Sequence, residues 1–247
     1  MGSQTHSRRK VHFIMNSKGG VGKSHLCWLL AQFHPSRNDR LICFDADATT
    51  ASFSSFPALD VRRIEMLREN RIDPRLFDEV LEACLGVDAD IIVDTGASSY
   101  AEWANYLIEN DAHHALLAAG KDVVVHAIVV GSGATLLETL KDLDDLAGQL
   151  PGEVTLMVWL NEHFGRIEQD GKSFFDMEVY DRHRARIHGV VTLPQRTRET
   201  FGADMAAMMK RRMTFAEAIA SPEFHVMAKS RLKQIRDHAY QQLEAVL

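Results

Sequence analysis

The stretch Asn16-Ser17-Lys18-Gly19-Gly20-Val21-Gly22-Lys23-Ser24 decides the fold of this chain. It follows an apolar run at 11–15, typical of a buried strand, and it leads into an apolar stretch at 25–33 that is long enough for a helix. A glycine-rich turn between a strand and a helix is the setting of a P-loop, which binds nucleotide phosphates. The sequence therefore predicts a nucleotide-binding α/β fold built around this turn.

Main-chain amides supply most of the chemistry of such a turn. Its glycines let the backbone curl around phosphate oxygens, and the N-terminus of the following helix adds roughly half a positive charge. Lys23 is expected to contact the β- and γ-phosphates, and the Ser24 hydroxyl to bind Mg²⁺. The expected nucleotide contacts in this segment are Ser17, Lys18, Gly19, Gly20, Val21, Gly22, Lys23, Ser24 and His25.

Two residues depart from the common P-loop pattern: Ser17 stands where a glycine is usual, and Lys18 precedes the paired glycines. With these departures, the segment KGGVGKS resembles the deviant Walker A box of the ParA/MinD family of P-loop ATPases. The resemblance implies that Lys18 is the signature lysine, which reaches into the nucleotide site of a second protomer. Lys18 and Lys23 are therefore predicted to be catalytic.

Acidic residues follow two further predicted strands. Asp45 and Asp47 come directly after the second strand, and Asp94 ends the third. Ligands of a parallel sheet lie beyond the carboxyl ends of its strands, and Asp94 fits the Walker B position, where it accepts from Ser24 or from a metal-bound water. Resemblance to the family implies that Asp47 is catalytic and orients the attacking water, while Asp45 supports the metal. The predicted metal residues are Ser24, Asp45 and Asp94; a loop of solvated carboxylates is the alternative for the Asp45 and Asp47 pair.

The expected base contacts lie after two later strands. Asn161 ends the apolar run that starts at Val154, and Pro194 lies in the loop after the last predicted strand. An asparagine amide offers one donor and one acceptor to an adenine edge, and an asparagine at this place reads the base in the ParA/MinD family. An asparagine that merely opens a turn is the alternative. The chain has no N-K-x-D motif, which favours ATP over GTP.

Strand-like and helical stretches alternate along the chain, which predicts a P-loop NTPase with a mostly parallel central sheet and helices on both faces. We expect residues 1–8 to be a flexible segment or tag, and 9–247 to form a single P-loop ATPase domain with a C-terminal helix. Segment 61–66 is ambiguous. Strands are predicted at 11–15, 40–44, 91–94, 115–119, 123–130, 154–160 and 187–192, and helices at 24–33, 74–85, 100–109, 134–150, 196–212 and 223–247.

The composition indicates the cellular compartment and argues against some classes of function. A net charge of -6 over 247 residues argues against a uniformly basic nucleic-acid-binding protein. Three isolated cysteines and the lack of a long apolar run predict a cytoplasmic protein, with peripheral attachment to a membrane as an alternative. The 12 histidines are scattered, and His113-His114 shows no ligand spacing with cysteine or aspartate, so no metal cage is expected.

Beyond the ATPase core, four stretches resemble the TraL-type conjugal transfer proteins of broad-host-range plasmids; they lie at 94–99, 158–161, 168–174 and 213–218. The likeness extends from the P-loop to the C-terminal helix. It implies a bacterial protein that serves plasmid conjugal transfer together with a protein partner of the transfer machinery.

The leading functional hypothesis is a Mg²⁺-ATP-dependent homodimerisation switch with slow, partner-stimulated ATP hydrolysis. A second hypothesis is a positioning protein that grips non-specific DNA or a membrane in its ATP state, through the basic segment 210–212 or the amphipathic helix at 223–247. A solvated, arginine-capped helix end is the preferred interpretation of the first segment, and a packed terminal helix that of the second. A third is a P-loop small-molecule kinase or synthetase, although no acid–base cluster beyond the three aspartates marks a substrate pocket.

Overall fold

The computed structural model describes residues 8–36, 40–69, 71–73, 75–131 and 133–247. Its centre is a seven-stranded sheet in which every neighbouring pair of strands is parallel, with the order β11-β8-β7-β1-β6-β2-β3. The predicted parallel α/β sheet is therefore confirmed. Its strands are β1 (Arg9–Ile14), β2 (Leu41–Asp45), β3 (Val61–Arg63), β6 (Asp90–Asp94), β7 (Lys121–Val130), β8 (Thr155–Asn161) and β11 (Ile187–Leu193).

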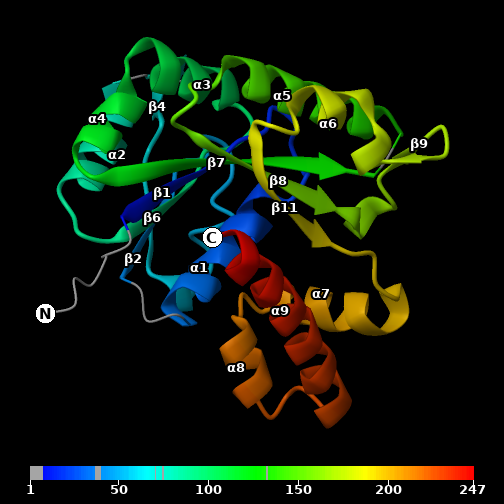
Figure 1. The fold of residues 1–247 in the computed structure, drawn as a ribbon. Coiled ribbons are helices and arrows are strands. Elements are labelled where there is room, and N and C mark those ends of the chain that lie inside the picture. The colour runs from blue at the N-terminus through cyan, green and yellow to red at the C-terminus, as the bar shows by residue number, and fades with distance from the viewer. Residues whose placement is uncertain (1–7, 37–39, 70, 74, 132) are drawn as a thin grey trace, which may run out of the picture.

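Helices cover both faces of the sheet, as Figure 1 shows. One face carries α2 (Arg75–Leu85), α3 (Tyr100–Glu109), α4 (Ala112–Ala118), α5 (Gly133–Gln149) and α6 (Glu178–His183). The other carries α1 (Lys23–Ser36), α7 (Ala203–Lys210), α8 (Phe215–Ala220) and α9 (Val226–Val246). Two small hairpins, β4 (Leu67–Arg68) with β5 (Arg71–Ile72) and β9 (Glu168–Gln169) with β10 (Lys172–Ser173), lie outside the main sheet.

The sheet separates two hydrophobic cores, and alternate residues of one strand enter different cores. In β7, Val123 and Val125 pack on the side of α5, whereas Val124 and Ile128 pack on the side of α1. Such a strand is apolar at every position because both of its faces are covered. The three tryptophans are almost fully buried in these cores, as their apolar neighbours predict: Trp28, Trp103 and Trp159.

The strand predicted at Ala115–Ala119 is wrong, because these residues lie in α4 and in the turn after it. A short apolar run has no periodicity that separates a strand from a helix. Alanine and leucine favour a helix, and Gly120, with φ of 78°, ends this one in the left-handed conformation. The predicted flexibility of residues 1–7 and the helix start at Pro74 lie outside the described residues.

The helix predicted at 196–212 is found from Arg198 to Lys210, but its first part is not an α-helix. Residues Arg198–Gly202 form a π-helical turn before α7 begins. The ambiguous segment 61–66 contributes the edge strand β3.

The C-terminal helix α9 packs against the edge strand β11, which favours the packed-helix alternative for this segment. Leu232, Ala239 and Leu243 of α9 are buried in the core on the α1 side. The Gln242 side chain accepts a hydrogen bond from Thr192 N and donates one to Thr192 O, each at 2.8 Å. The Gln242 side chain of α9 therefore pairs with main-chain groups of β11 that no neighbouring strand bonds at this edge of the sheet. Among the described residues, no helix is both long and apolar enough to cross a bilayer.

Candidate nucleotide site

The carboxyl ends of β1, β2 and β6 meet at the P-loop. Ile14, the last residue of β1, pairs with Asp94 of β6, and Asp94 also pairs with Asp45 of β2. The loop 15–22 then leads from β1 into α1. The predicted metal residues therefore lie beside the predicted phosphate loop because three adjacent parallel strands end at one edge.

Lys23 is folded back over its own loop. Its Nζ donates to Lys18 O at 2.9 Å, and the residue is only 7% exposed. Burial lowers the pKa of Lys23, and the negative charges of Asp94 and Asp47 oppose this shift only in part. Gly22 has φ of 107°, and a Cβ there would come within 2.9 Å of the Asn161 amide nitrogen, so only glycine fits.

Asp94 carries a fully buried carboxylate beside the start of α1. Its exposure is 0%, and within the described part of the chain neither of its oxygens has a hydrogen-bond partner. Burial raises its pKa to about 6, an effect opposed by the neighbouring Ser24 hydroxyl and by the charge of Lys23. An unpaired buried carboxylate is costly, and a cation at this point would relieve that cost.

The loop after β2 holds its two aspartates in different ways. Asp45 is fully buried and accepts from Ser54 N at 2.8 Å and Asp47 N at 3.3 Å. Asp47 accepts from the main-chain and hydroxyl groups of Thr49 and Thr50, at 2.8–3.1 Å. Although burial raises the pKa of Asp47, these hydrogen bonds outweigh it and the pKa is lowered. Asp47 is therefore ionised, and its assignment as the water-orienting residue stays a prediction.

Gly96 sets the contact between this loop and the loop after β6. It has φ of 67°, and a Cβ at Gly96 would lie 2.8 Å from Asp47 Cγ. Any L side chain would therefore push the two loops apart.

A residue that the sequence analysis does not identify, Asp142 of α5, anchors the start of the P-loop. Its carboxylate accepts from Ser17 N at 2.8 Å, from Ser17 Oγ at 2.6 Å and from Asn16 Nδ2 at 3.3 Å. The Asn16 side chain in turn bonds the main chain of Ile128 in β7. The loop is thus tied to α5 and to the neighbouring strand before any ligand binds.

Lys18 also contacts α5. Its Nζ lies 2.8 Å from Oε2 of Glu138, and both side chains are close to half exposed, at 42% and 49%. Glu138 stands one helical turn before Asp142, so the same face of α5 meets two consecutive residues of the loop. Lys18 is therefore available at the surface beside the site, held by a carboxylate of its own chain.

The predicted base contacts lie on the other side of the loop. The Asn161 side chain donates to Val21 O at 2.9 Å and accepts from His163 N at 3.2 Å. Pro194 directly follows Leu193, the residue of β11 that pairs with Asn161. Asn161 therefore borders the P-loop and Pro194 follows the neighbouring strand, and the contacts of both with a base stay predictions.

His25, in the first turn of α1, is half-buried and stacks on Trp28, with ring centroids 5.2 Å apart. Burial, together with the nearby His163, lowers its pKa to about 4. His25 is therefore neutral at neutral pH and adds no charge to the site.

These residues fit a magnesium-bound nucleoside triphosphate. The loop offers amides at the start of a helix and a lysine, which suit phosphate. Mg²⁺ prefers oxygen ligands, and the Ser24 hydroxyl and the Asp94 carboxylate offer them. Within the described part of the chain the Asp94 oxygens have no hydrogen-bond partner. Bound there, Mg²⁺ would neutralise phosphate charge.

The chain resembles known proteins in both sequence and fold. A MinD cell division protein of Aquifex aeolicus has 16% identity and a TM-score of 0.53, over 95% of this chain and 97% of that one. A ParA family ATPase of Chlorobium tepidum TLS has 14% identity and a TM-score of 0.54, over 92% and 98%. At these identities the likeness shows the fold alone, which is the MinD/ParA P-loop fold that the sequence predicts.

No protein-family model matches the chain. A TraL protein of Escherichia coli is 36% identical over 236 residues, which is 96% of this chain and 98% of the relative. A second TraL protein of Escherichia coli is 36% identical over 235 residues, with 95% and 97% coverage. The similarity runs nearly end to end in both, so the chain belongs to the TraL family.

Proposed function

We propose that this protein is an ATPase that binds Mg²⁺-ATP in the P-loop and uses it as a switch between a monomer and a homodimer. The observation that carries the nucleotide part is the buried Asp94 beside Ser24 and Lys23, whose two oxygens have no hydrogen-bond partner among the described residues. A solved MinD of Pyrococcus horikoshii OT3, with a TM-score of 0.50 and 14% identity, is complexed with Mg-ADP. That complex supports the same ligand class for this chain.

Within the site, each residue has a task. The loop amides and Lys23 hold the phosphates, and Ser24, Asp45 and Asp94 hold the metal directly or through water. Asp47 holds the attacking water, so it acts as the catalytic carboxylate. To do so, the Asp47 carboxylate must break some of the hydrogen bonds that it accepts from Thr49 and Thr50. ATP hydrolysis is therefore slow until a partner or a second copy rearranges this loop.

The dimer part of the proposal rests on Lys18. Its side chain lies at the surface, 42% exposed, and is paired with Glu138 rather than with its own loop. In the dimer, Lys18 of each protomer stabilises phosphate charge on the other, and a cation supplied in trans is worth about 10³–10⁵ in rate in related phosphoryl-transfer systems. Because ATP stabilises the dimer and its hydrolysis products do not, ATP sets the population of the two states.

The cellular context follows from the sequence resemblance. TraL-type proteins serve conjugal plasmid transfer, so we place this ATPase in a bacterial transfer system, with a protein partner that stimulates hydrolysis. MinD of Aquifex aeolicus has been solved in a complex with MinC, which is a precedent for a protein partner on this fold.

Nucleotide binding is tested by titrating a fluorescent ATP analogue with and without Mg²⁺. We expect Lys23→Ala to abolish binding, and Lys18→Ala to bind as the wild type does. Asp94→Asn should bind nucleotide but lose most of the gain that Mg²⁺ gives. Equal affinity of the wild type and Lys23→Ala would sink the assignment of the loop as the phosphate site.

A further inference from the structure

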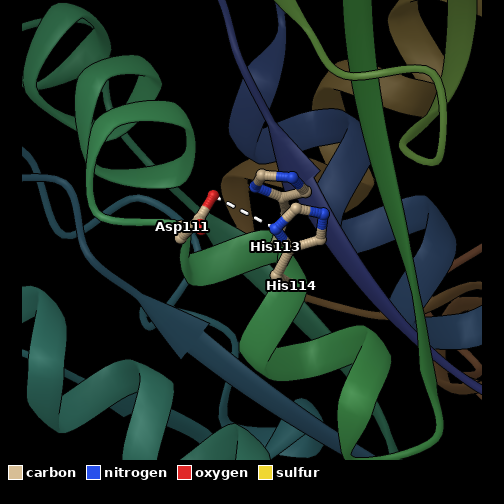
Figure 2. A group of neighbouring side chains, drawn as sticks. All are labelled: Asp111, His113 and His114. Atoms are coloured by element: carbon tan, nitrogen blue, oxygen red, sulfur yellow. Dashed lines mark ion pairs between the residues drawn. The ribbon is translucent and has the colours of Figure 1, made fainter.

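A carboxylate and two imidazoles gather at the corner between α3 and α4, outside the candidate nucleotide site. Asp111, His113 and His114 each offer one ligand atom, and these three atoms all lie within 4.8 Å of one another. Figure 2 shows the two rings next to the Asp111 carboxylate, and the ring centroids are 4.1 Å apart. The spacing of His113-His114 predicts no metal ligands, yet the turn into α4 brings Asp111 beside both histidines.

His113 is the fixed member of this cluster. The residue is 3% exposed, and its Nδ1 lies 2.8 Å from Leu107 O. Because a carbonyl oxygen only accepts, Nδ1 carries the proton and Nε2 carries a lone pair. Among the described residues, that buried Nε2 has no hydrogen-bond partner. A metal-binding histidine commonly donates its other ring N–H to a backbone carbonyl, which fixes the ring in this way.

Asp111 and His114 are the exposed members of this cluster. Their side chains are 70% and 57% exposed, and His114 Nδ1 lies 3.1 Å from Asp111 Oδ1, the dashed line in Figure 2. A pair so exposed is held weakly in solution. Both side chains can therefore turn toward a cation beside His113 without disturbing the core.

We propose that Asp111, His113 and His114 form a binding site for a divalent transition-metal ion, with Zn²⁺ the best match. Two imidazoles and one carboxylate suit Zn²⁺, whereas Mg²⁺ and Ca²⁺ prefer ligands that are all oxygen. Three protein ligands leave a fourth position for water or for a side chain of another molecule. All three ligands lie at the N-cap and in the first turn of α4, so the ion holds the start of this helix together. The site is separate from the Mg²⁺ site, because α3 begins after the Gly96 loop and Asp111 follows its far end.

The test uses the full-length protein, stripped of metal and free of nucleotide. Zn²⁺ is titrated by calorimetry, and Co²⁺ is titrated while the visible spectrum is recorded. We expect one equivalent of Zn²⁺ that excess Mg²⁺ does not displace, and Co²⁺ absorption typical of four-coordinate nitrogen and oxygen ligands. His114→Ala and Asp111→Asn should each weaken Zn²⁺ binding at least tenfold.

These two variants keep the fold intact, because both side chains are exposed and asparagine tolerates the left-handed backbone at Asp111, where φ is 55°. His188→Ala, which removes an exposed histidine of β11, is the matched control and should bind as the wild type does. Zn²⁺ should also raise the melting temperature of the wild type and of His188→Ala more than that of the two site variants. No Zn²⁺ binding by the wild type at micromolar concentration, or binding that both site variants retain in full, overturns the proposal.

Discussion

The Nζ atom of Lys18 lies 2.8 Å from Oε2 of Glu138, so the lysine that we propose to act on a second protomer is held by a carboxylate of its own chain. Lys18 must give up this ion pair before it can act across a dimer. Glu138→Gln should therefore favour the ATP-bound dimer. An exposed ion pair is worth about 0.2–1 kcal/mol, and a homodimer has two of them to break, so we expect the dimer dissociation constant to fall by about two- to thirtyfold.

The matched control for Glu138→Gln is Asp145→Asn, which removes another exposed ion pair of α5, the one with Lys141, without touching Lys18. Sedimentation of both variants with ATP at low and high salt makes the comparison. Weaker dimers in Glu138→Gln would show that Glu138 supports the dimer, against this account.

Asp142 should contribute both to the stability of the fold and to ATP affinity, although it stands on a helix rich in acidic residues. It accepts three hydrogen bonds from the start of the P-loop, so Asp142→Asn should lower the free energy of unfolding by about 1–3 kcal/mol. ATP should bind about tenfold more weakly, because the loop amides are no longer held in place. Asp144→Asn, which breaks only contacts with α6, should leave ATP affinity unchanged. Urea unfolding and nucleotide titration of both variants provide the measurement.

Replacing either aspartate at the ends of β6, Asp90 or Asp94, with asparagine should change the stability of the protein, but in opposite directions. Burial raises the pKa of Asp94, which has no hydrogen-bond partner among the described residues, so Asp94→Asn should stabilise the nucleotide-free protein by about 1–3 kcal/mol at pH 7.5. Burial also disfavours the ionised form of Asp90, yet its bonds with His34 and Lys10 N lower its pKa. Asp90→Asn should therefore destabilise the protein. Melting temperatures with the same sign for both variants would contradict this.

Acid should destabilise the fold through buried histidines. His126 accepts from the Trp159 indole and bonds to His12, each at 2.9 Å, and burial lowers the pKa of both histidines, that of His126 to about 3. Below pH 6.5 the unfolded chain gains protons that the folded chain cannot, so stability falls as the pH falls from about 6.5 towards 3. The slope is up to about 1.4 kcal/mol per pH unit for each histidine.

The matched variant for this pH effect is His126→Gln. It should be less stable than the wild type at pH 7.5, because the Trp159 contact is disturbed, and it should lose stability less steeply between pH 6.5 and 5. Urea midpoints at several pH values measure both effects. Parallel curves for the two proteins would rule out His126 as a source of the acid sensitivity.

The parts of the site that can be predicted from sequence are those with a local signal. The loop at 16–24, the carboxylates at the ends of β2 and β6, and Asn161 at the end of β8 all follow apolar runs, and parallel strands bring such ends to one edge. The alternation of strands and helices likewise predicts the parallel sheet.

The contacts that cannot be predicted come from distant segments. Glu138 and Asp142 stand on a helix rich in acidic residues, where a solvated face is the ordinary interpretation; only the packing of α5 beside the P-loop brings them to it. His12 and His126 lie inside apolar strands, and their bond depends on the pairing of β1 with β7. The Asp111 cluster is local in sequence, but it depends on a turn between two helices, and the apolar run of α4 is too short to distinguish a helix from a strand.

The central claim is that ATP, held by the P-loop, draws two copies of this chain together through Lys18. The most direct measurement is the molar mass in solution, by light scattering, with Mg²⁺-ADP and then with Mg²⁺-ATP, for the wild type, Asp47→Ala and Lys18→Ala. We predict a monomer with ADP in all three, a stable dimer with ATP in Asp47→Ala, and a monomer with ATP in Lys18→Ala. A single mass for Asp47→Ala with both nucleotides, or a normal ATP-dependent dimer in Lys18→Ala, would contradict the account.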